Sequence, residues 1–150
     1  MNKTQKNFEK NGYVIVPGNK ELLNKIRKII FNNIKDNKKI KNKNDNEENI
    51  TKIFNNFHHY VSLKELNSLR FNIYKKINVG SVFSETYYKI AKNYLDELVG
   101  NELSMQKKIN LSIQMPKDKD SLLDLHSDIY AGESPFQVVV WIPLVDAYDT

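Results

Sequence analysis

His126 and Asp128 are the two residues of this sequence whose types and spacing could together hold a metal ion. Side chains alternate between the two faces of an extended segment, so residues two positions apart point the same way. An imidazole nitrogen and a carboxylate oxygen that project side by side are two adjacent ligands for a divalent cation. The spacing therefore predicts a metal site here, on an extended segment.

The residues that follow the pair favour this interpretation. Ala131–Pro135 is rich in turn-forming residues, and Phe136–Val145 is the most strand-like run in the chain. Both alternating faces of that run are largely apolar, which predicts a central strand covered on both sides. Pro143 cannot donate a ladder hydrogen bond, so it marks a bulge or the end of the strand. One face would carry Phe136, Val138, Val140, Ile142 and Leu144, and the other Gln137, Val139, Trp141 and Val145.

A second strand is predicted upstream of the pair, at Ile109–Met115, because polar and apolar residues alternate there. Two interpretations are open. The run is either an edge strand whose polar face meets water or a barrel strand whose polar face lines a site. Its apolar face would carry Leu111, Ile113 and Met115, and its polar face Asn110, Ser112 and Gln114.

Residues 1–100 are predicted to be mainly helical. Ser62 and Glu65 match the capping box S-x-x-E, and Asn19 precedes a run of apolar residues at helical spacing. Gly12 and Gly100 stand where left-handed residues end helices. The apolar spacing predicts helices over residues 4–10, 19–34, 50–60, 62–77 and 81–99.

The other stretches of this half are predicted to be irregular or extended. Tyr13–Val16 is a short β-rich run before the turn signal Pro17-Gly18. Asp36–Asn49 is almost entirely Lys, Asn, Asp and Glu, so we expect a flexible exposed loop; a lid or partner-binding role is the alternative. His58 and His59 are adjacent, so on a helix they point in different directions and are predicted to be surface or half-buried packing residues rather than ligands.

The composition limits the class of protein. A chain of 150 residues, 40% of them hydrophobic, fits a single domain over residues 1–150 with a real core. The absence of Cys excludes disulfides and thiolate metal sites. The sequence has no secretory signal and no run of about 18 apolar residues, so we predict a cytoplasmic protein without a membrane span.

The net charge of +5 is unevenly distributed. Residues 1–100 carry 19 basic and 10 acidic residues, whereas residues 101–150 carry 4 and 8. The half with the His–Asp pair is therefore acidic, which suits a cation and repels phosphate. Bidentate recognition of bases or phosphates depends on Arg, and only Arg27 and Arg70 are present. We predict no nucleic-acid partner; a basic domain that binds an acidic partner through residues 20–100 is one alternative.

Taken in order, three segments resemble the phytanoyl-CoA dioxygenase-like branch of the Fe(II)/2-oxoglutarate-dependent oxygenases. They are Phe8–Gly18 at the entry, Leu125–Asp128 with the metal pair, and Val140–Asp146 in the strand that follows. The resemblance implies an α+β fold with a double-stranded β-helix core, jelly-roll or cupin-like, and N-terminal helices packed outside it. Residues 1–100 would supply these helices, and residues 101–150 the core strands.

The resemblance also implies an activity. His126 and Asp128 would ligate Fe(II), and Ser112, Gln114 and Trp141 would lie near the co-substrate 2-oxoglutarate. With O2, 2-oxoglutarate would be oxidised to succinate and CO2 while an unactivated C–H bond of a small metabolite, lipid or carbohydrate intermediate is hydroxylated. Halogenating relatives have a small residue at the position of Asp128, so the carboxylate indicates hydroxylation.

One departure from the family pattern affects this expectation. The family needs a distal His and a basic residue that pairs with 2-oxoglutarate, and neither follows Trp141. The facial triad of such iron sites takes two His and one carboxylate. Three explanations compete: a fragment of a longer oxygenase, an inactive truncated relative, or a barrel completed by a partner chain. Open strand edges of an incomplete barrel would promote self-association.

The main alternative function is a non-catalytic jelly-roll protein for binding or scaffolding, which retains the strand pattern without a complete metal site. In that case His126 is a turn or core residue and Asp128 a cap. Because the distal His and the basic residue are missing, we do not expect these 150 residues to be an active oxygenase on their own.

Overall fold

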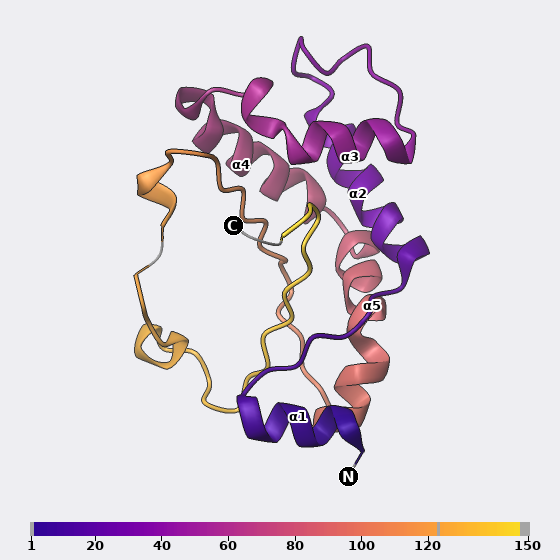
Figure 1. Cartoon of the computed structure of the whole chain (residues 1–150), viewed down its shortest axis with the longest axis vertical. Coiled ribbons are helices and arrows are strands. Elements are labelled where there is room, and N and C mark those ends of the chain that lie inside the picture. The colour runs from indigo at the N-terminus through magenta and orange to yellow at the C-terminus, as the bar shows by residue number, and fades with distance from the viewer. Residues whose placement is uncertain (1, 123, 148–150) are drawn as a thin grey trace.

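The computed structural model describes residues 2–122 and 124–147, in which all regular elements are helical. Figure 1 shows the helices gathered on one side of the molecule, while the C-terminal third runs as an open arc on the other. No helix in this described part combines the length and the apolar composition that a bilayer crossing requires. The elements are α1 Lys3–Asn11, α2 Lys20–Ile34, α3 Glu47–Asn55, η1 Phe57–His59, α4 Leu63–Ile77, α5 Val82–Val99, η2 Lys119–Ser121 and η3 Asp128–Ala131.

Helix α2 is the central element of the helical part and packs against α3, α4 and α5. It begins where the sequence predicts, because the side-chain oxygen of Asn19 accepts a hydrogen bond from the Leu22 N–H at 3.0 Å. Helix α1 ends at the predicted stop as well. Gly12 has φ +76° and its N–H donates to the Phe8 carbonyl at 2.8 Å, a left-handed end that suits glycine.

Helix α4 begins at the predicted capping box. The Glu65 carboxylate accepts from the Ser62 N–H at 3.1 Å and from the Ser62 hydroxyl at 2.7 Å. These hydrogen bonds lower the pKa of Glu65 below its ordinary value. The predicted bounds of α4 and α5 are confirmed to within a residue, because caps and apolar spacing are local signals.

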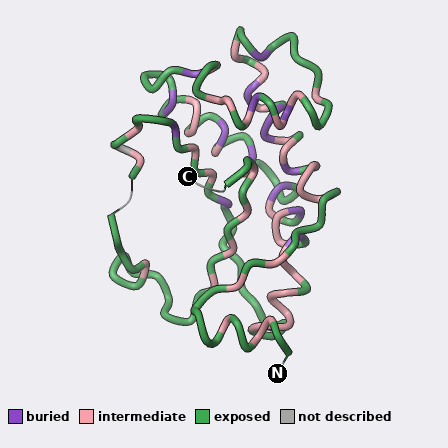
Figure 2. The backbone as a smooth tube through the Cα atoms, in the orientation of Figure 1, coloured by how far each residue is buried: buried purple, intermediate pink, exposed green. Residues whose placement is uncertain are grey.

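The hydrophobic core lies between α2, α3, α4 and α5, where Figure 2 shows most of the buried positions. Phe31 on α2 and Ile73 on α4 are 0% exposed. Full burial of such side chains stabilises the fold by about 1.5–3 kcal/mol each. The other buried members on these helices are Ile26, Ile30, Ile34, Ile50, Ile53, Ile77, Phe83 and Ile90.

The connection from α2 to α3 is shorter than the flexible loop predicted over residues 36–49. Asn46 caps α3 by accepting from the Asn49 N–H at 2.9 Å, so the helix already begins at Glu47. Within the connection, Ile40 is 0% exposed and joins the core. The segment is also attached by the ion pair of Asp36 with Lys76 at 2.9 Å and by hydrogen bonds from Asn37 and Lys39 to the Tyr60 and His59 carbonyls.

The predicted α+β fold with a double-stranded β-helix core is wrong. Residues 2–122 and 124–147 contain no strand, sheet or barrel. Ile109–Met115 and Phe136–Val145 run without helical turns, but no backbone hydrogen bond among the described residues joins them. Tyr13–Val16 is likewise unpaired. An isolated strand cannot satisfy its own backbone groups, so strand-like composition makes a sheet only where a second strand lies alongside.

Burial along these two segments still follows the predicted alternation. Leu111, Ile113 and Met115 are buried or half-buried, whereas the polar residues between them are exposed. In Phe136–Val145 the side chains at Val138, Val140, Ile142 and Leu144 are half-buried, whereas Phe136 on the same face is 92% exposed. The prediction that both faces are covered is wrong, since Trp141 on the other face is 72% exposed.

Side chains from the helices hold the C-terminal third in place of a β-ladder. The Asn78 side chain accepts from the Ile109 N–H at 2.8 Å and donates to the Ile109 carbonyl at 3.0 Å. The Tyr87 hydroxyl, whose pKa is raised by burial, donates to the Val140 carbonyl. Each extended segment is thus attached at a few points rather than along its length.

Arg70 on α4 makes the densest of these attachments. Its Nε donates to the Ile113 carbonyl at 3.1 Å, and its Nη2 reaches the Asp118 carboxylate at 3.0 Å and the Ser121 hydroxyl at 2.6 Å. The Ser121 hydroxyl donates to Asp118 too, and this bond, followed by Arg70, lowers the pKa of Asp118. One guanidinium therefore joins the Ile109–Met115 segment and the loop after it to the helices.

Candidate functional site

The structure brings His126 and Asp128 together on the open arc. Their nearest side-chain atoms, Nε2 and Oδ1, are 3.4 Å apart, and the side chains are 53% and 46% exposed. Ser127 between them is extended, with φ −123° and ψ 130°, which is the backbone geometry on which the predicted proximity depends. Asp128 itself begins the short helix η3.

A main-chain oxygen orients the His126 ring. The Nδ1 atom lies 2.7 Å from the Asp124 carbonyl, and a carbonyl can only accept, so Nδ1 carries a proton. In the neutral ring Nε2 then keeps its lone pair toward Asp128. Metal-bound imidazoles are oriented in this way, with one nitrogen on a backbone carbonyl and the other on the cation. If the ring is doubly protonated, the same geometry is an ordinary ion pair.

The pair fits two ligands of one divalent cation. Ligand atoms about 2.1 Å from a metal in neighbouring positions are about 3 Å apart, close to the observed separation. Gln137 donates to the second oxygen of Asp128 at 3.3 Å and so helps to orient the carboxylate. However, no group of three or more His, Cys, Asp or Glu residues in the described part of the chain could hold a metal. A facial triad is therefore incomplete there.

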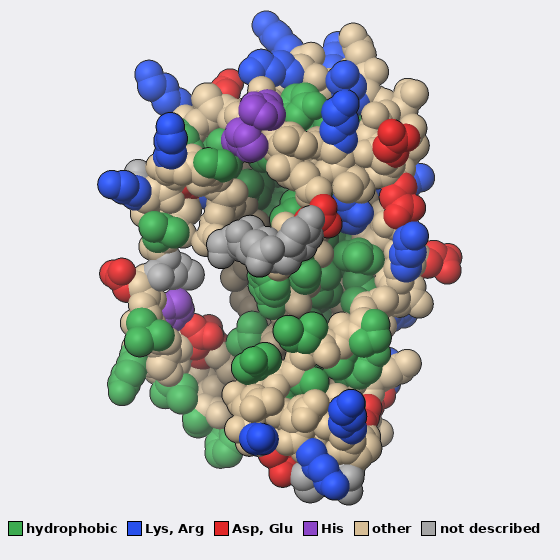
Figure 3. All heavy atoms as spheres, viewed as in Figure 1, with side chains coloured by type: hydrophobic (Ala, Val, Ile, Leu, Met, Phe, Trp, Pro, Cys, Tyr) green, Lys and Arg blue, Asp and Glu red, His purple; other side chains and the backbone are tan. Residues whose placement is uncertain are grey.

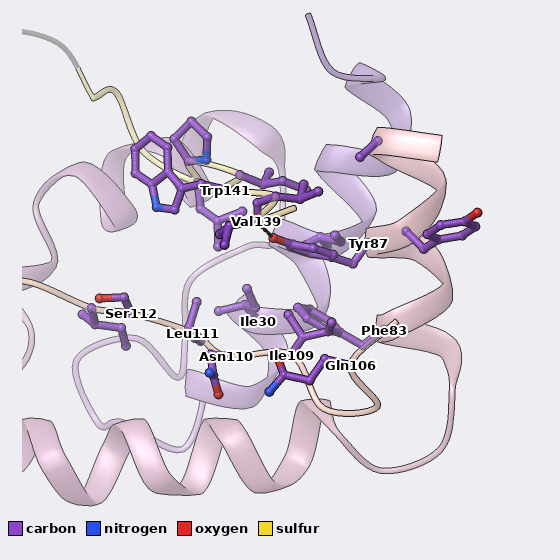
Figure 4. A pocket seen from close by; sticks show the side chains of 18 of the residues that line it. Ile30, Phe83, Tyr87, Gln106, Ile109, Asn110, Leu111, Ser112, Val139 and Trp141 are labelled. Atoms are coloured by element: carbon purple, nitrogen blue, oxygen red, sulfur yellow. Dashed lines mark hydrogen bonds between the residues drawn. The ribbon is translucent and has the colours of Figure 1, made fainter. Parts of the chain in front are cut away.

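A cavity of about 1500 Å³ lies between the helices and the two extended segments. Figure 3 shows it as a hollow lined by hydrophobic side chains at the centre of the molecule. In Figure 4, Val139 and Trp141 lie on one side, with Leu111 and Ser112 opposite. Ile30 from α2 contributes to the helical wall.

The predicted 2-oxoglutarate-binding residues line the cavity, but the predicted metal ligands do not. Ser112, Gln114 and Trp141, which the resemblance places near 2-oxoglutarate, all line it. His126 and Asp128 are not part of its lining. The predicted cofactor residues and the predicted metal ligands therefore occupy two neighbouring places in the structure rather than one.

Two residues connect these places. Gln137 lines the cavity and donates to the Asp128 carboxylate, and Glu133 lines the cavity while its N–H donates to the Asp128 carbonyl at 3.2 Å. The metal pair is thus linked by hydrogen bonds to the cavity wall.

Neither arginine lines the cavity among the described residues. Arg70 is engaged with the C-terminal loop, and one Nη of Arg27 donates to the Thr51 hydroxyl at 2.8 Å. Burial lowers the pKa of Arg27, and the nearby carboxylates of Glu47 and Asp146 oppose this effect. The basic residue that the resemblance requires for 2-oxoglutarate is therefore not supplied by either arginine.

Sequence reasoning missed the residues that position this site. Asn78, Arg70 and Tyr87 each bond to the backbone of a segment 31, 43 and 53 residues further along the chain. The sole signal was the rarity of Arg in a Lys-rich chain, since long-range pairing leaves no local pattern.

The remaining histidines do not extend the metal site. His58 and His59 are exposed at η1, with ring centroids 4.1 Å apart, and His58 contributes to the cavity wall. Comparison with protein-family models, curated proteins and solved structures finds no match to this chain. The site therefore has to be interpreted from its own residues.

Proposed function

We propose that this chain takes part in an Fe(II)/2-oxoglutarate-dependent oxygenase that hydroxylates a small substrate, with His126 and Asp128 holding the iron. The observation that carries the proposal is the 3.4 Å approach of His126 Nε2 to Asp128 Oδ1 in a half-exposed position. Iron bound there would supply the activation of O2 at coordination positions that protein ligands leave open.

The residues around the pair support this proposal. The Asp124 carbonyl holds the ring so that Nε2 is available, and Gln137 holds the carboxylate. The cavity beyond Gln137, with its largely apolar lining, offers a substrate a concave binding site. The support from this structure comes from the pair and the cavity, and neither depends on a jelly-roll.

The proposal also requires a third protein ligand from outside the described residues. Two protein ligands hold a cation more weakly than three, so we expect these residues to bind Fe(II) with an affinity well below that of a complete site. The added ligand and a cation for 2-oxoglutarate would come from further sequence or from a partner chain.

Metal binding is the first test. We expect Mn²⁺, a spectroscopic substitute for Fe(II), to bind at one site per chain in electron paramagnetic resonance titrations. His126→Ala and Asp128→Ala should each weaken this binding about tenfold or more. His59→Ala and Asp45→Ala are the matched controls, since they remove the same groups elsewhere. Equal binding by all five proteins would refute the assignment.

Turnover is the second test, in the protein supplemented with whatever chain completes the site. Succinate should form from 2-oxoglutarate only with Fe(II), and Asp128→Ala should abolish it. Unchanged succinate formation in that variant would show that the pair does not hold the catalytic iron.

A non-catalytic binding protein for apolar molecules is the second candidate function. It is favoured by the separation of the cavity lining from His126 and Asp128, which a binding role does not need. Uptake of an apolar ligand by a chain that binds no Mn²⁺ would support this candidate over the oxygenase.

A further inference from the structure

We infer that the large cavity selects neutral, mainly apolar molecules and rejects carboxylates and phosphates. The inference deepens the proposed function by naming its substrate class. It rests on that function only for the claim that the bound molecule is oxidised. The binding itself depends on the cavity alone.

The charges of the lining carry the inference. The chain has 23 Lys and Arg residues, yet none of them lines the cavity among the residues that the structure describes. The charged lining residues are all acidic: Glu102, Glu133 and Asp146. An anionic ligand would therefore lose its hydration without gaining a counter-charge and would face three carboxylates. Figure 3 shows hydrophobic side chains in the hollow and most Lys and Arg side chains toward the outline of the molecule.

The neighbouring charged residues do not change this balance. The guanidinium of Arg70 is occupied by the Ile113 carbonyl and Asp118, and Arg27 donates to Thr51. Of the three acids, Asp146 is held at the wall by the Asn55 side chain, which donates to it at 2.5 Å. Arg27 is close enough to Asp146 to offset part of its charge, so the negative character of the wall comes mainly from Glu102 and Glu133.

The size and the polar groups of the cavity indicate the kind of neutral molecule. A volume of about 1500 Å³ exceeds that of an ordinary pocket for a drug-sized ligand, about 300–1000 Å³. It has room for a long-chain or polycyclic compound. Ser112, Gln114 and Gln137 offer uncharged hydrogen-bonding groups, which suit a hydroxyl or carbonyl at one end of such a molecule. On this inference Ser112 and Gln114 face the neutral ligand rather than 2-oxoglutarate.

A matched pair of competitors tests the selectivity. The neutral fluorescent probe N-phenyl-1-naphthylamine should bind the protein saturably at pH 8 without metal. Dodecan-1-ol should displace it at a concentration about tenfold or more below that of dodecanoate, which has the same chain length and is ionised at this pH. Displacement by dodecanoate at equal or lower concentration, or absence of saturable probe binding, would overturn the inference.

A second pair of variants places the selectivity in the cavity. Val139 lines the cavity and is 69% exposed, so Val139→Lys adds a cation there without disturbing the core. It should narrow the preference for dodecan-1-ol over dodecanoate several-fold. Val79→Lys is the control, because Val79 is 77% exposed and lies outside the lining. If the two variants change the preference for dodecan-1-ol over dodecanoate equally, and circular dichroism shows that both are folded, the selectivity does not come from the cavity.

The metal titration separates this inference from the proposed function. Mn²⁺ binding without probe uptake would overturn the cavity inference and leave the metal site standing. Probe uptake without Mn²⁺ binding would support the cavity inference and refute the oxygenase.

Discussion

The helical part and the C-terminal third of this molecule acquire their order in different ways. From Lys3 to Val99 the chain forms helices whose backbone groups bond within each helix, and the apolar faces of α2 to α5 share one core. In residues 100–122 and 124–147 the regular elements are the short 3₁₀ helices η2 and η3, and the chain is otherwise held by side chains such as Arg70 and Tyr87 from the helices. A helix is complete when its own residues are present, whereas an extended segment needs a partner.

The same comparison applies to apolar residues. Phe31 is 0% exposed within the core, whereas Phe136 on the C-terminal segment is 92% exposed. Both have the same side chain, but only the first has helices packed on every side. Apolar residues of the C-terminal third therefore contribute to the core only where they face the helices, as Ile109 does, and otherwise to the cavity wall and the surface.

The largest expected effect comes from Phe31→Ala. It should lower the free energy of unfolding by about 3–5 kcal/mol, because a fully buried aromatic side chain leaves a cavity among packed helices. The matched change Phe136→Ala should alter the free energy by less than about 0.5 kcal/mol. Urea denaturation followed by far-ultraviolet circular dichroism measures both. Comparable losses would show that the two regions share one core after all.

A smaller and more local effect is expected from Arg70→Met, which keeps the length of the side chain but removes its hydrogen bonds. Backbone amides in residues 109–121 should lose about 1–3 kcal/mol of protection in hydrogen exchange, since charged hydrogen bonds contribute about that much. Backbone amides in α2 and α5 should keep their protection from hydrogen exchange. Arg27→Met is the control, and the comparison fails if it exposes the same C-terminal amides.

The smallest expected effect is a pH dependence of the same attachment. The Ser121 hydroxyl and Arg70 lower the pKa of Asp118 below its ordinary value of 3.8, so the ionised carboxylate stabilises the folded loop above that pH. This stabilisation is lost as the pH falls through the lowered pKa. Exchange protection in residues 116–121 should therefore decline on acidification before that of the helices.

Asp118→Asn tests the assignment of this acid step. The variant should show weaker protection at neutral pH and no further loss on acidification in residues 116–121. Glu65 titrates in the same direction, but its protonation loosens only the first turn of α4. An unchanged acid transition in Asp118→Asn would assign the effect to another group.

The helices were predictable because their signals lie within a few residues. Asn19 caps α2, the Ser62–Glu65 box begins α4, and Gly12 ends α1, each through a bond to a near neighbour. Ile40 was not predicted to be buried, since its charged neighbours give no sign that turns direct it back to the core.

The candidate site was predictable in part for the same reason. The spacing of His126 and Asp128 was sufficient for their approach, because only Ser127 between them had to be extended. The placement of Ser112, Gln114 and Trp141 around a cavity, with the pair outside its lining, was not predictable. It depends on bonds such as Tyr87 to Val140, which span 53 residues.

The amino-acid sequence by itself determined the helices, their caps and the alternation of faces along Ile109–Met115 and Phe136–Val145. Only the tertiary structure decided whether those two segments form a sheet, and it left them unpaired against the helices. The physical reason is the range of the hydrogen bonds. Helical bonds close within four residues, whereas an extended backbone takes its partners from residues far along the chain.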